Sequence, residues 1–448
     1  MPGMSRRVFR FLFLGIPLAC LCSVLFYFLP PVHQRLAWRV DNVRAQIKYA
    51  LDPPEEAVFI PQEIEPIVQA TFRALTPIAS PTRPATTTPT PTELDPGPTQ
   101  TPSPSVTPTV TPTPLPEKVI LDGVKYEDQH GRWNYCGPSN LSMALTFWGW
   151  DGNRDVVGRY VKPEDKDKNV MPYELQDFVE TQTTGMSALI RYGGDIDLIK
   201  RMITGGFPVL VEKGYYEYDY TGKLGWMGHY QFINGYDDTE GVLILQDTYI
   251  KDGKDHRTSY DEFMQGWRSF DYIFLMVYPQ ERQQEVYALL GPYLDPAWAS
   301  NHALEVATAE SQSLDGIDQF FAWFNRGTSH VNLQDYGDAA ADFDYAFKLY
   351  ANLSNDDTTR PYRILWYQTW PYWAYYYTGR YQDVINLADT TLEDTISEPV
   401  LEESFYWRAL AREALGDQKG AIKDLKESVR LNPHFTPGKE QLARLNGG

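Results

Sequence analysis

The sequence predicts a multidomain chain in which an α+β domain is followed by an all-α region of repeats. Residues 117–280 begin with segments of helical periodicity and continue with short, turn-bounded segments rich in β-branched and aromatic residues, as strands are. Residues 281–448 show an internal pattern that recurs three times. A segment rich in Pro and Thr, residues 77–116, separates both regions from the N-terminus. These features indicate two folded domains and a spacer.

The first helix of the α+β domain is expected over residues 136–148. Leu141 and Leu145 fall on its apolar face, and Gly149 is placed to end it. Further helices are predicted over 173–181 and 195–204, and strands over 207–212, 229–235, 241–246 and 272–277. Helices in the first half and strands in the second half give an α+β domain.

The repeats are recognised by three short motifs. Leu-Gln-Asp at 333–335, Thr-Gly-Arg at 378–380 and Leu-Gly-Asp at 415–417 each precede an apolar helical run. Their offsets of 45 and 37 residues fit a repeat of about 34 residues with insertions. Residues 318–444 therefore resemble tetratricopeptide repeats. Such units stack to bury their apolar faces and leave a concave groove, which implies a protein partner.

The N-terminus has the features of a membrane anchor. Arg6, Arg7 and Arg10 precede an apolar run over residues 11–30, which is long enough to span a bilayer at about 1.5 Å per residue. We expect residues 1–33 to form a cytoplasmic tip and a transmembrane helix, with the later domains outside the cytoplasm at a bacterial cell surface. A cleaved signal peptide, or a lipid anchor at Cys20, is the alternative.

Two segments connect this anchor to the folded domains. Residues 34–76 are predicted to form a juxtamembrane stalk with a short helix. Residues 77–116 cannot bury a core, and their prolines favour an extended, disordered linker of about 120 Å reach at about 3.1 Å per residue. The net charge of −19 argues against a basic patch for nucleic acid or anionic lipid.

A single cysteine lies outside the predicted membrane segment. Cys20 and Cys22 belong to that segment, so Cys136 is expected to be a free thiol. Residues 134–139 read Asn-Tyr-Cys-Gly-Pro-Ser and lead into a helix. The amides and dipole at a helix N-terminus favour the thiolate, which is the reactive form of cysteine. Cys136 is therefore the candidate nucleophile.

A cysteine nucleophile needs a base and an oxyanion donor. Of the seven histidines, His229 opens a predicted strand, and the next strand ends at Asp247. A hairpin through residues 237–241 would bring the two residues together, so that Asp247 fixes the imidazole. The backbone N–H of Cys136 and the side-chain amide of Gln129 are the candidate oxyanion donors.

The order Gln, Cys-Gly-Pro-Ser, His and Asp resembles the papain-like peptidases that process double-glycine leaders of bacteriocins. It is more similar to their free-standing relatives, the peptidase family thirty-nine-like domains. The resemblance implies a papain-like fold with Cys136 as nucleophile, His229 as base and acid, Asp247 as orienting residue and Gln129 as oxyanion donor. The leader-processing members sit on a transporter with an ATPase, which this sequence does not show, so their cleavage specificity is not carried over.

The predicted function is a membrane-anchored extracytoplasmic cysteine peptidase whose repeats bind a substrate protein or partner. No cofactor or metal is expected; a zinc site at Cys136, His229 and Asp247 lacks any metal-ligand spacing. Three alternatives remain. Cys136 could be a buried structural thiol in an inactive surface-displayed binding module. The triad could also transfer the acyl group to an amine, as in transglutaminase or amidase relatives. Finally, residues 215–226 could form an aromatic lip for a peptide or a self-packed hairpin.

Overall fold

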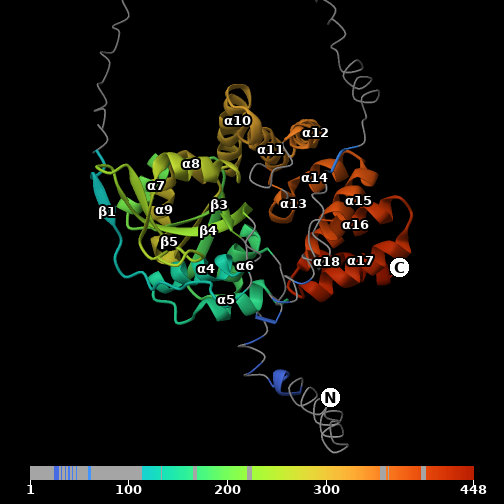
Figure 1. Cartoon of the computed structure of the whole chain (residues 1–448), viewed down its shortest axis with the longest axis horizontal. Coiled ribbons are helices and arrows are strands. Elements are labelled where there is room, and N and C mark those ends of the chain that lie inside the picture. Colours follow the sequence, from blue (N-terminus) through green and yellow to red (C-terminus); the bar gives the residue numbers. More distant parts are fainter. Residues whose placement is uncertain are drawn as a thin grey trace, which may run out of the picture. The chain divides into compact units, whose positions relative to one another are not determined.

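The structure is a computed structural model, and Figure 1 shows its trace. It describes residues 114–132, 134–164, 169–218, 224–353, 360–361, 363–394 and 400–447, with residues 25–29, 59–61 and the single positions 32, 36, 39, 40, 43 and 47. Most of the predicted membrane segment and almost all of the Pro/Thr linker lie outside these residues. Within the described residues, no helix combines the length and the apolar composition needed to cross a membrane.

An antiparallel sheet organises residues 118–279. The strand order is β2-β7-β3-β4-β5-β6, and β1 pairs with β4 outside this path. The strands are β1 (Lys118–Ile120), β2 (Met186–Arg191), β3 (Val209–Tyr218), β4 (Leu224–Asp237), β5 (Val242–Asp247), β6 (His256–Ser259) and β7 (Phe274–Pro279). The predicted hairpin between β4 and β5 is present, with Asp237 opposite Val242.

Helices cover both faces of this sheet. Leu210 packs with α4, α5 and α6, whereas its neighbours Val209 and Val211 pack with α7, α8 and α9. Successive side chains of a strand point to opposite faces, so the two helix groups lie on opposite sides. The helices are α4 (Cys136–Phe147), α5 (Arg154–Val161), α6 (Pro172–Gln182), α7 (Ile196–Thr204), α8 (Tyr260–Arg268) and α9 (Gln283–Leu290).

Every predicted helix and strand of this domain is present, and the largest changes of boundary are at β3, which continues to Tyr218, and at β4, which begins at Leu224. Gly149 follows the end of α4 and has a φ of 88°, a conformation that suits glycine. The chain is more mixed than the predicted division into a helical half and a strand half, because β2 lies between α6 and α7 and α8 lies between β6 and β7.

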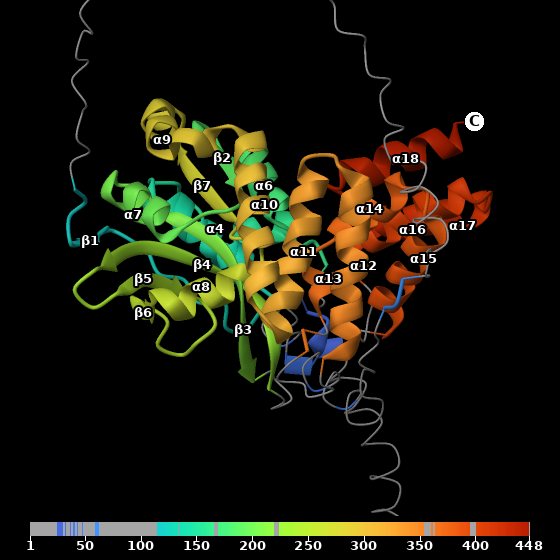
Figure 2. The same cartoon turned by 90° about the horizontal axis from the view of Figure 1, so that it is seen from above.

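The region after residue 280 is helical. Figure 2 shows α10, α11 and α12 side by side. Its elements are the 3₁₀ turns Gln280–Arg282 and Gly291–Leu294, α10 (Pro296–Ser313), α11 (Gly316–Asn332), α12 (Tyr336–Asn352), α13 (Ile364–Tyr367), α14 (Trp370–Tyr377), α15 (Tyr381–Asp389), the π-helical turn Thr390–Asp394, α16 (Glu402–Ala414), α17 (Gln418–Leu431) and α18 (Thr436–Asn446).

Each of the three sequence motifs is the turn between two packed helices. Residues 333–335 join α11 to α12, 378–380 join α14 to α15, and 415–417 join α16 to α17. The middle residue of each turn has a positive φ: 64° at Gln334, 76° at Gly379 and 89° at Gly416. The shared motifs therefore encode the same three-residue connection.

The helical region and the sheet share one apolar core. Trp226 of β4 is 2% exposed and stacks on Phe270 at 5.8 Å between ring centroids. Trp226 also contacts Phe321 of α11 and Tyr367 of α13, both at 5.6 Å. Before the linker, Phe59 is buried in the same core.

Candidate active site

Cys136 is the first residue of α4, where the backbone amides of a helix lack partners within the helix. Its sulfur accepts hydrogen bonds from the backbone N–H groups of Gly137 and Tyr230. A Cβ atom at position 137 would lie 3.3 Å from the Cβ of Val170, a tight contact that glycine avoids. The thiol is buried in surroundings that favour its anionic form.

His229 and Asp247 lie side by side on the β4–β5 hairpin. Asp247 is directly opposite Gln231, and His229 is two residues earlier on the same face of β4. The distance from His229 Nε2 to Asp247 Oδ1 is 3.1 Å. Asp247 also accepts hydrogen bonds from Gln231 Nε2 at 2.7 Å and from the backbone N–H of Tyr249 at 2.8 Å. With Nε2 held in this way, Nδ1 of His229 is the nitrogen left for the thiol.

The three ionisable groups are electrostatically coupled. Burial alone would raise the pKa of the Cys136 thiol, but the hydrogen bond and positive charge of His229 bring that pKa below its ordinary value. Burial opposes the imidazolium too, yet the charge and hydrogen bond of Asp247 raise the pKa of His229 to about 10. Against the effect of burial, His229 holds the pKa of Asp247 well below its usual range. These interactions shift the equilibrium toward a thiolate–imidazolium pair.

Gln129 lies in the segment before α4 and is held against the end of β5. Its backbone N–H donates to the carbonyl of Thr248 at 2.8 Å, and Thr248 Oγ1 donates to Gln129 Oε1 at 2.8 Å. Tyr126 and His130 contact the same strand end, through the carbonyls of residues 247 and 249. Because Oε1 is engaged, the Nε2 end of the amide is the one available to an oxyanion.

Asn140 is a functional candidate that the sequence interpretation missed. Its Nδ2 donates to the carbonyl of Tyr230 at 2.8 Å and to that of Cys136 at 2.9 Å. The side chain is fully buried, so it joins the helix of the cysteine directly to the strand of His229. The available signal was an amide side chain four residues after the cysteine, one helical turn further along α4.

The aromatic segment 215–226 has features of both predicted alternatives, the lip beside the site and the self-packed hairpin. Tyr215 contacts the ring of His229 edge-on at 5.3 Å, so it borders the candidate site. Trp226, at the other end of the segment, is buried in the shared core rather than exposed as a lip. The segment is therefore a hairpin with one ring beside the site and one ring in the core.

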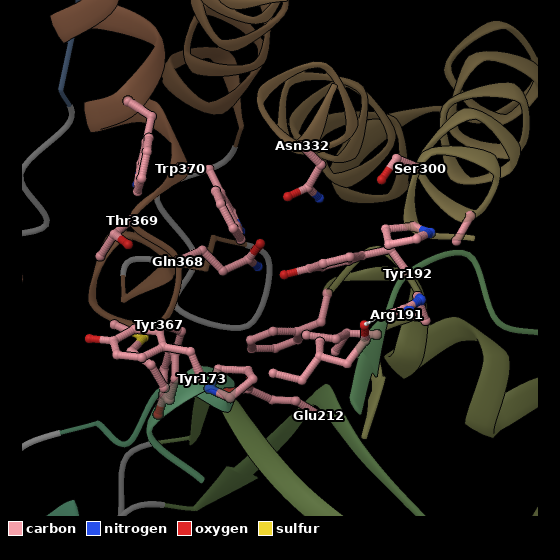
Figure 3. Close-up of a pocket in the computed structure, with 18 of the residues that line it drawn as sticks. Tyr173, Arg191, Tyr192, Glu212, Ser300, Asn332, Tyr367, Gln368, Thr369 and Trp370 are labelled. Atoms are coloured by element: carbon pink, nitrogen blue, oxygen red, sulfur yellow. Dashed lines mark hydrogen bonds between the residues drawn. The ribbon is translucent and has the colours of Figure 1, made fainter. Parts of the chain in front are cut away.

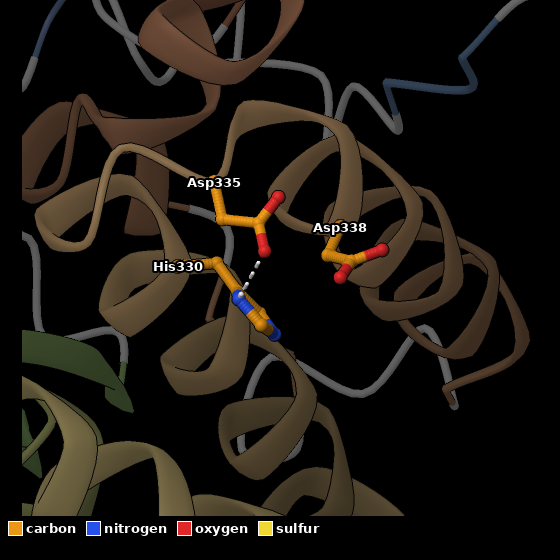
Figure 4. Close-up of side chains that lie close together, drawn as sticks. All are labelled: His330, Asp335 and Asp338. Carbon is orange, nitrogen blue, oxygen red and sulfur yellow. Dashed lines mark ion pairs between the residues drawn. The ribbon is translucent and has the colours of Figure 1, made fainter. Parts of the chain in front are cut away.

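Among the described residues, one group of side chains could approach a metal ion. His330 of α11 and Asp335 and Asp338 at the start of α12 have potential ligand atoms within 4.8 Å of one another (Figure 4). Both carboxylates are exposed, and His330 Nδ1 lies 3.8 Å from Asp335. The side chain of His330 is only 13% exposed, and burial lowers its pKa, so the group holds exposed carboxylates beside an imidazole whose neutral form is favoured; it is distinct from the Cys136 site.

Comparison with known proteins identifies the class of the sheet domain. Residues 121–274 match the model of the Peptidase_C39 like family, so the chain contains a C39-like domain of papain-like fold. The predicted resemblance is confirmed for this domain. Among curated proteins, none matches the chain.

Several solved structures are similar to parts of the chain. One is described as a C39-like peptidase from Bacillus anthracis, with 16% identity, a TM-score of 0.30, and coverage of 36% of this chain and 97% of that chain. MamA residues 41 to the end from Desulfovibrio magneticus RS-1 has 15% identity, a TM-score of 0.28, and coverage of 41% and 86%. A double mutant of MamA RS-1 has 16% identity, the same TM-score, and coverage of 37% and 81%.

Proposed function

We propose that the chain is a cysteine peptidase that hydrolyses peptide bonds through Cys136, His229 and Asp247, with Gln129 as an oxyanion donor. The observation that carries this proposal is the buried network in which Asp247 holds His229 at 3.1 Å and His229 hydrogen-bonds to a thiol at a helix N-terminus. The C39-like character of residues 121–274 supports it. No step of the proposed reaction requires a metal or an organic cofactor.

In the proposed reaction, the thiolate of Cys136 adds to the carbonyl carbon of the scissile bond. The oxyanion that forms accepts hydrogen bonds from the Cys136 N–H and from Gln129 Nε2. The imidazolium of His229 gives its proton to the amine as the C–N bond breaks, and a thioester remains. His229 then takes a proton from water as the water oxygen adds to the thioester. Collapse releases the carboxylic acid product and restores the ion pair.

The proposed setting is the outer face of a bacterial membrane. The basic residues before the apolar run at 11–30 support a single-pass anchor, and the composition of 77–116 supports an extended linker. The helical region is proposed to form tetratricopeptide-like repeats that bind the substrate protein or a partner. Its support is the recurrence of the same left-handed turn at Gln334, Gly379 and Gly416.

The test is to measure alkylation of Cys136 by iodoacetamide against pH in the full-length protein. We expect fast alkylation well below the pKa of about 8.5 of a free thiol. We also expect the loss of that reactivity in His229→Ala but not in His256→Ala, which changes a histidine of β6. Cleavage of a peptide library should disappear in Cys136→Ala.

Ordinary or absent reactivity of Cys136 would overturn the assignment and leave a surface-displayed binding module. Mass spectrometry of the products with and without an added amine separates hydrolysis from acyl transfer, since both proceed through the thioester.

A further inference from the structure

A cavity of about 330 Å³ lies between the C39-like domain and the helical region. Tyr192 and Glu212 line its sheet side, and Tyr367 and Trp370 line its helical side (Figure 3). Trp373 of α14 adds a further ring. The cavity is thus walled by aromatic side chains and also contains a carboxyl group, which a site for a purely apolar ligand would not require.

Glu212 is buried, with 2% of its surface exposed, and its Oε1 has no hydrogen-bond partner among the described residues. It lies on β3 directly opposite Tyr230, next to the pair formed by Lys213 and His229. The charges of Cys136 and His229 both act on its carboxyl group. Glu212 thus couples the cavity electrostatically to the candidate nucleophile, while Cys136 and His229 themselves lie outside the cavity lining. An unsatisfied carboxyl oxygen in such a place is costly unless a ligand completes it.

The charges around Glu212 favour a cationic ligand. Arg191, the basic residue of the lining, donates to the carbonyls of Tyr293 and Leu294 and is committed to the backbone there. Glu403 of α16 is a second carboxyl group of the lining and hydrogen-bonds to Tyr173. The Tyr230 hydroxyl, which hydrogen-bonds to Glu212, and the Cys136–His229 pair also act on this carboxyl group. Burial raises the pKa of Tyr192, and the charge of Glu212 adds to this effect. The uncharged polar side chains of the lining are those of Ser300, Asn332, Gln368 and Thr369.

We propose that this cavity binds the ammonium or guanidinium group of a basic side chain that flanks the scissile bond of the substrate. The rings of Tyr192, Tyr367 and Trp370 supply faces on which a cation is stabilised, and Glu212 supplies the counter-charge. The inference rests on the proposed peptidase function, because the cavity is assigned to the substrate of that site. It names the substrate class as peptides with Lys or Arg beside the cleaved bond.

Binding should depend on pH in a defined direction. Burial, followed by the charge of Cys136, raises the pKa of Glu212 well above its ordinary value, which favours the neutral acid. Pairing with a cation requires the ionised carboxylate and releases a proton. The affinity for a basic side chain should therefore increase as the pH rises, as long as the ligand stays protonated.

The experiment measures binding separately from cleavage. Full-length protein carrying Cys136→Ala is titrated with N-acetyl-lysine methylamide, with its arginine analogue and with the uncharged N-acetyl-norleucine methylamide. Tryptophan fluorescence reports binding, because Trp370 and Trp373 line the cavity. The same titrations are made after adding Glu212→Gln, which keeps the shape but removes the charge, and after adding Glu281→Gln as an exposed control.

We expect at least tenfold tighter binding of a basic ligand than of the norleucine ligand, loss of that preference with Glu212→Gln, and no change with Glu281→Gln. If Glu212→Gln lowers the folded fraction, Trp370→Leu provides a second test, with a three- to tenfold loss of affinity expected from the missing ring. Equal binding of lysine and norleucine ligands, or a preference that survives Glu212→Gln, overturns the inference.

The outcome for the peptidase proposal is read independently. In the protein with Cys136 intact, basic binding without cleavage of any library peptide would support the cation site and overturn the hydrolytic function. Cleavage without preference for Lys or Arg beside the scissile bond would support the hydrolytic function and overturn the cation site.

Discussion

The charge of Asp247 should control the reactivity of Cys136, and Asp247→Asn isolates this effect. The new amide can still accept from the N–H of Tyr249 and from His229 through its oxygen. Its NH₂ group would meet Gln231, whose Oε1 is buried without a partner among the described residues and can accept once the Gln231 amide turns over. The substitution should therefore leave the fold intact and remove only the negative charge.

The size of the effect follows from the pKa of His229. That pKa should fall from about 10 toward the ordinary 6.5, a difference of roughly 4–5 kcal/mol at about 1.4 kcal/mol per pKa unit. Without the imidazolium, the pKa of Cys136 returns to about 8.5 or higher, so that at pH 7 no more than about one thiol in thirty is ionised. Alkylation at pH 7 should slow by about 30-fold or more.

The assay is the rate of iodoacetamide alkylation from pH 4 to 10, in parallel with thermal unfolding. Asp238→Asn, at the far end of the same hairpin, is the matched control and should leave the profile unchanged. Because the folded-state pKa of His229 is raised, its stabilising contribution is complete below about pH 6.5 and is lost as the pH rises through about 10. An unchanged alkylation profile in a folded Asp247→Asn protein would refute the proposed role of Asp247.

Three further substitutions test other parts of the structure. Asn140→Ala should lower the free energy of unfolding by about 2–4 kcal/mol, because it removes both buried hydrogen bonds of one amide, and it should slow alkylation of Cys136. Urea denaturation that shows no loss of stability would contradict the role of Asn140 in joining α4 to β4. Gln129→Ala should reduce kcat/KM for peptides by about 10²–10³-fold but leave alkylation by iodoacetamide nearly unchanged, because alkylation forms no oxyanion. An equal loss in both assays would argue for a structural role of Gln129. Trp226→Ala should destabilise the protein by about 3–5 kcal/mol in denaturant titrations, and a loss below 1 kcal/mol would show that the shared core does not depend on this ring.

The proximity of Cys136, His229 and Asp247 could be predicted from the sequence because much of the information is local. The Cys-Gly-Pro sequence fixes a helix start. The turn at residues 237–241 sets the pairing of β4 with β5 next to it, and a bulge between Ile233 and Gly235 then shifts the register so that Gln231 lies opposite Asp247. The predicted strand at residue 229 proved to start earlier, at Leu224, because Gly225 and Gly228 weaken the strand pattern there. Gly228 is needed for a tertiary reason: a Cβ atom would lie 2.6 Å from Phe270 and 2.7 Å from Tyr367.

The parts that the sequence did not reveal depend on contacts between distant segments. Glu212 reads as one polar residue in an apolar strand, and its burial against a cavity wall comes from helices more than 80 residues later. Asn140 acquires its role through the carbonyl of Tyr230, 90 residues away. Strand β2 was missed because it pairs with β7 alone, at the edge of the sheet, and lacks a regular alternation of polar and apolar residues.

The burial of Trp226 limits how the two regions of the chain can be exchanged in evolution. The ring belongs to β4, the strand that carries His229, yet its neighbours Phe321 and Tyr367 are encoded 95 and 141 residues downstream. Recombination that exchanged everything after residue 280 would leave this ring with Phe270 but without Phe321 and Tyr367, unless the incoming segment supplied equivalent residues. The two regions are therefore expected to be passed on as a pair, and a chain cut between them should aggregate through its uncovered tryptophan.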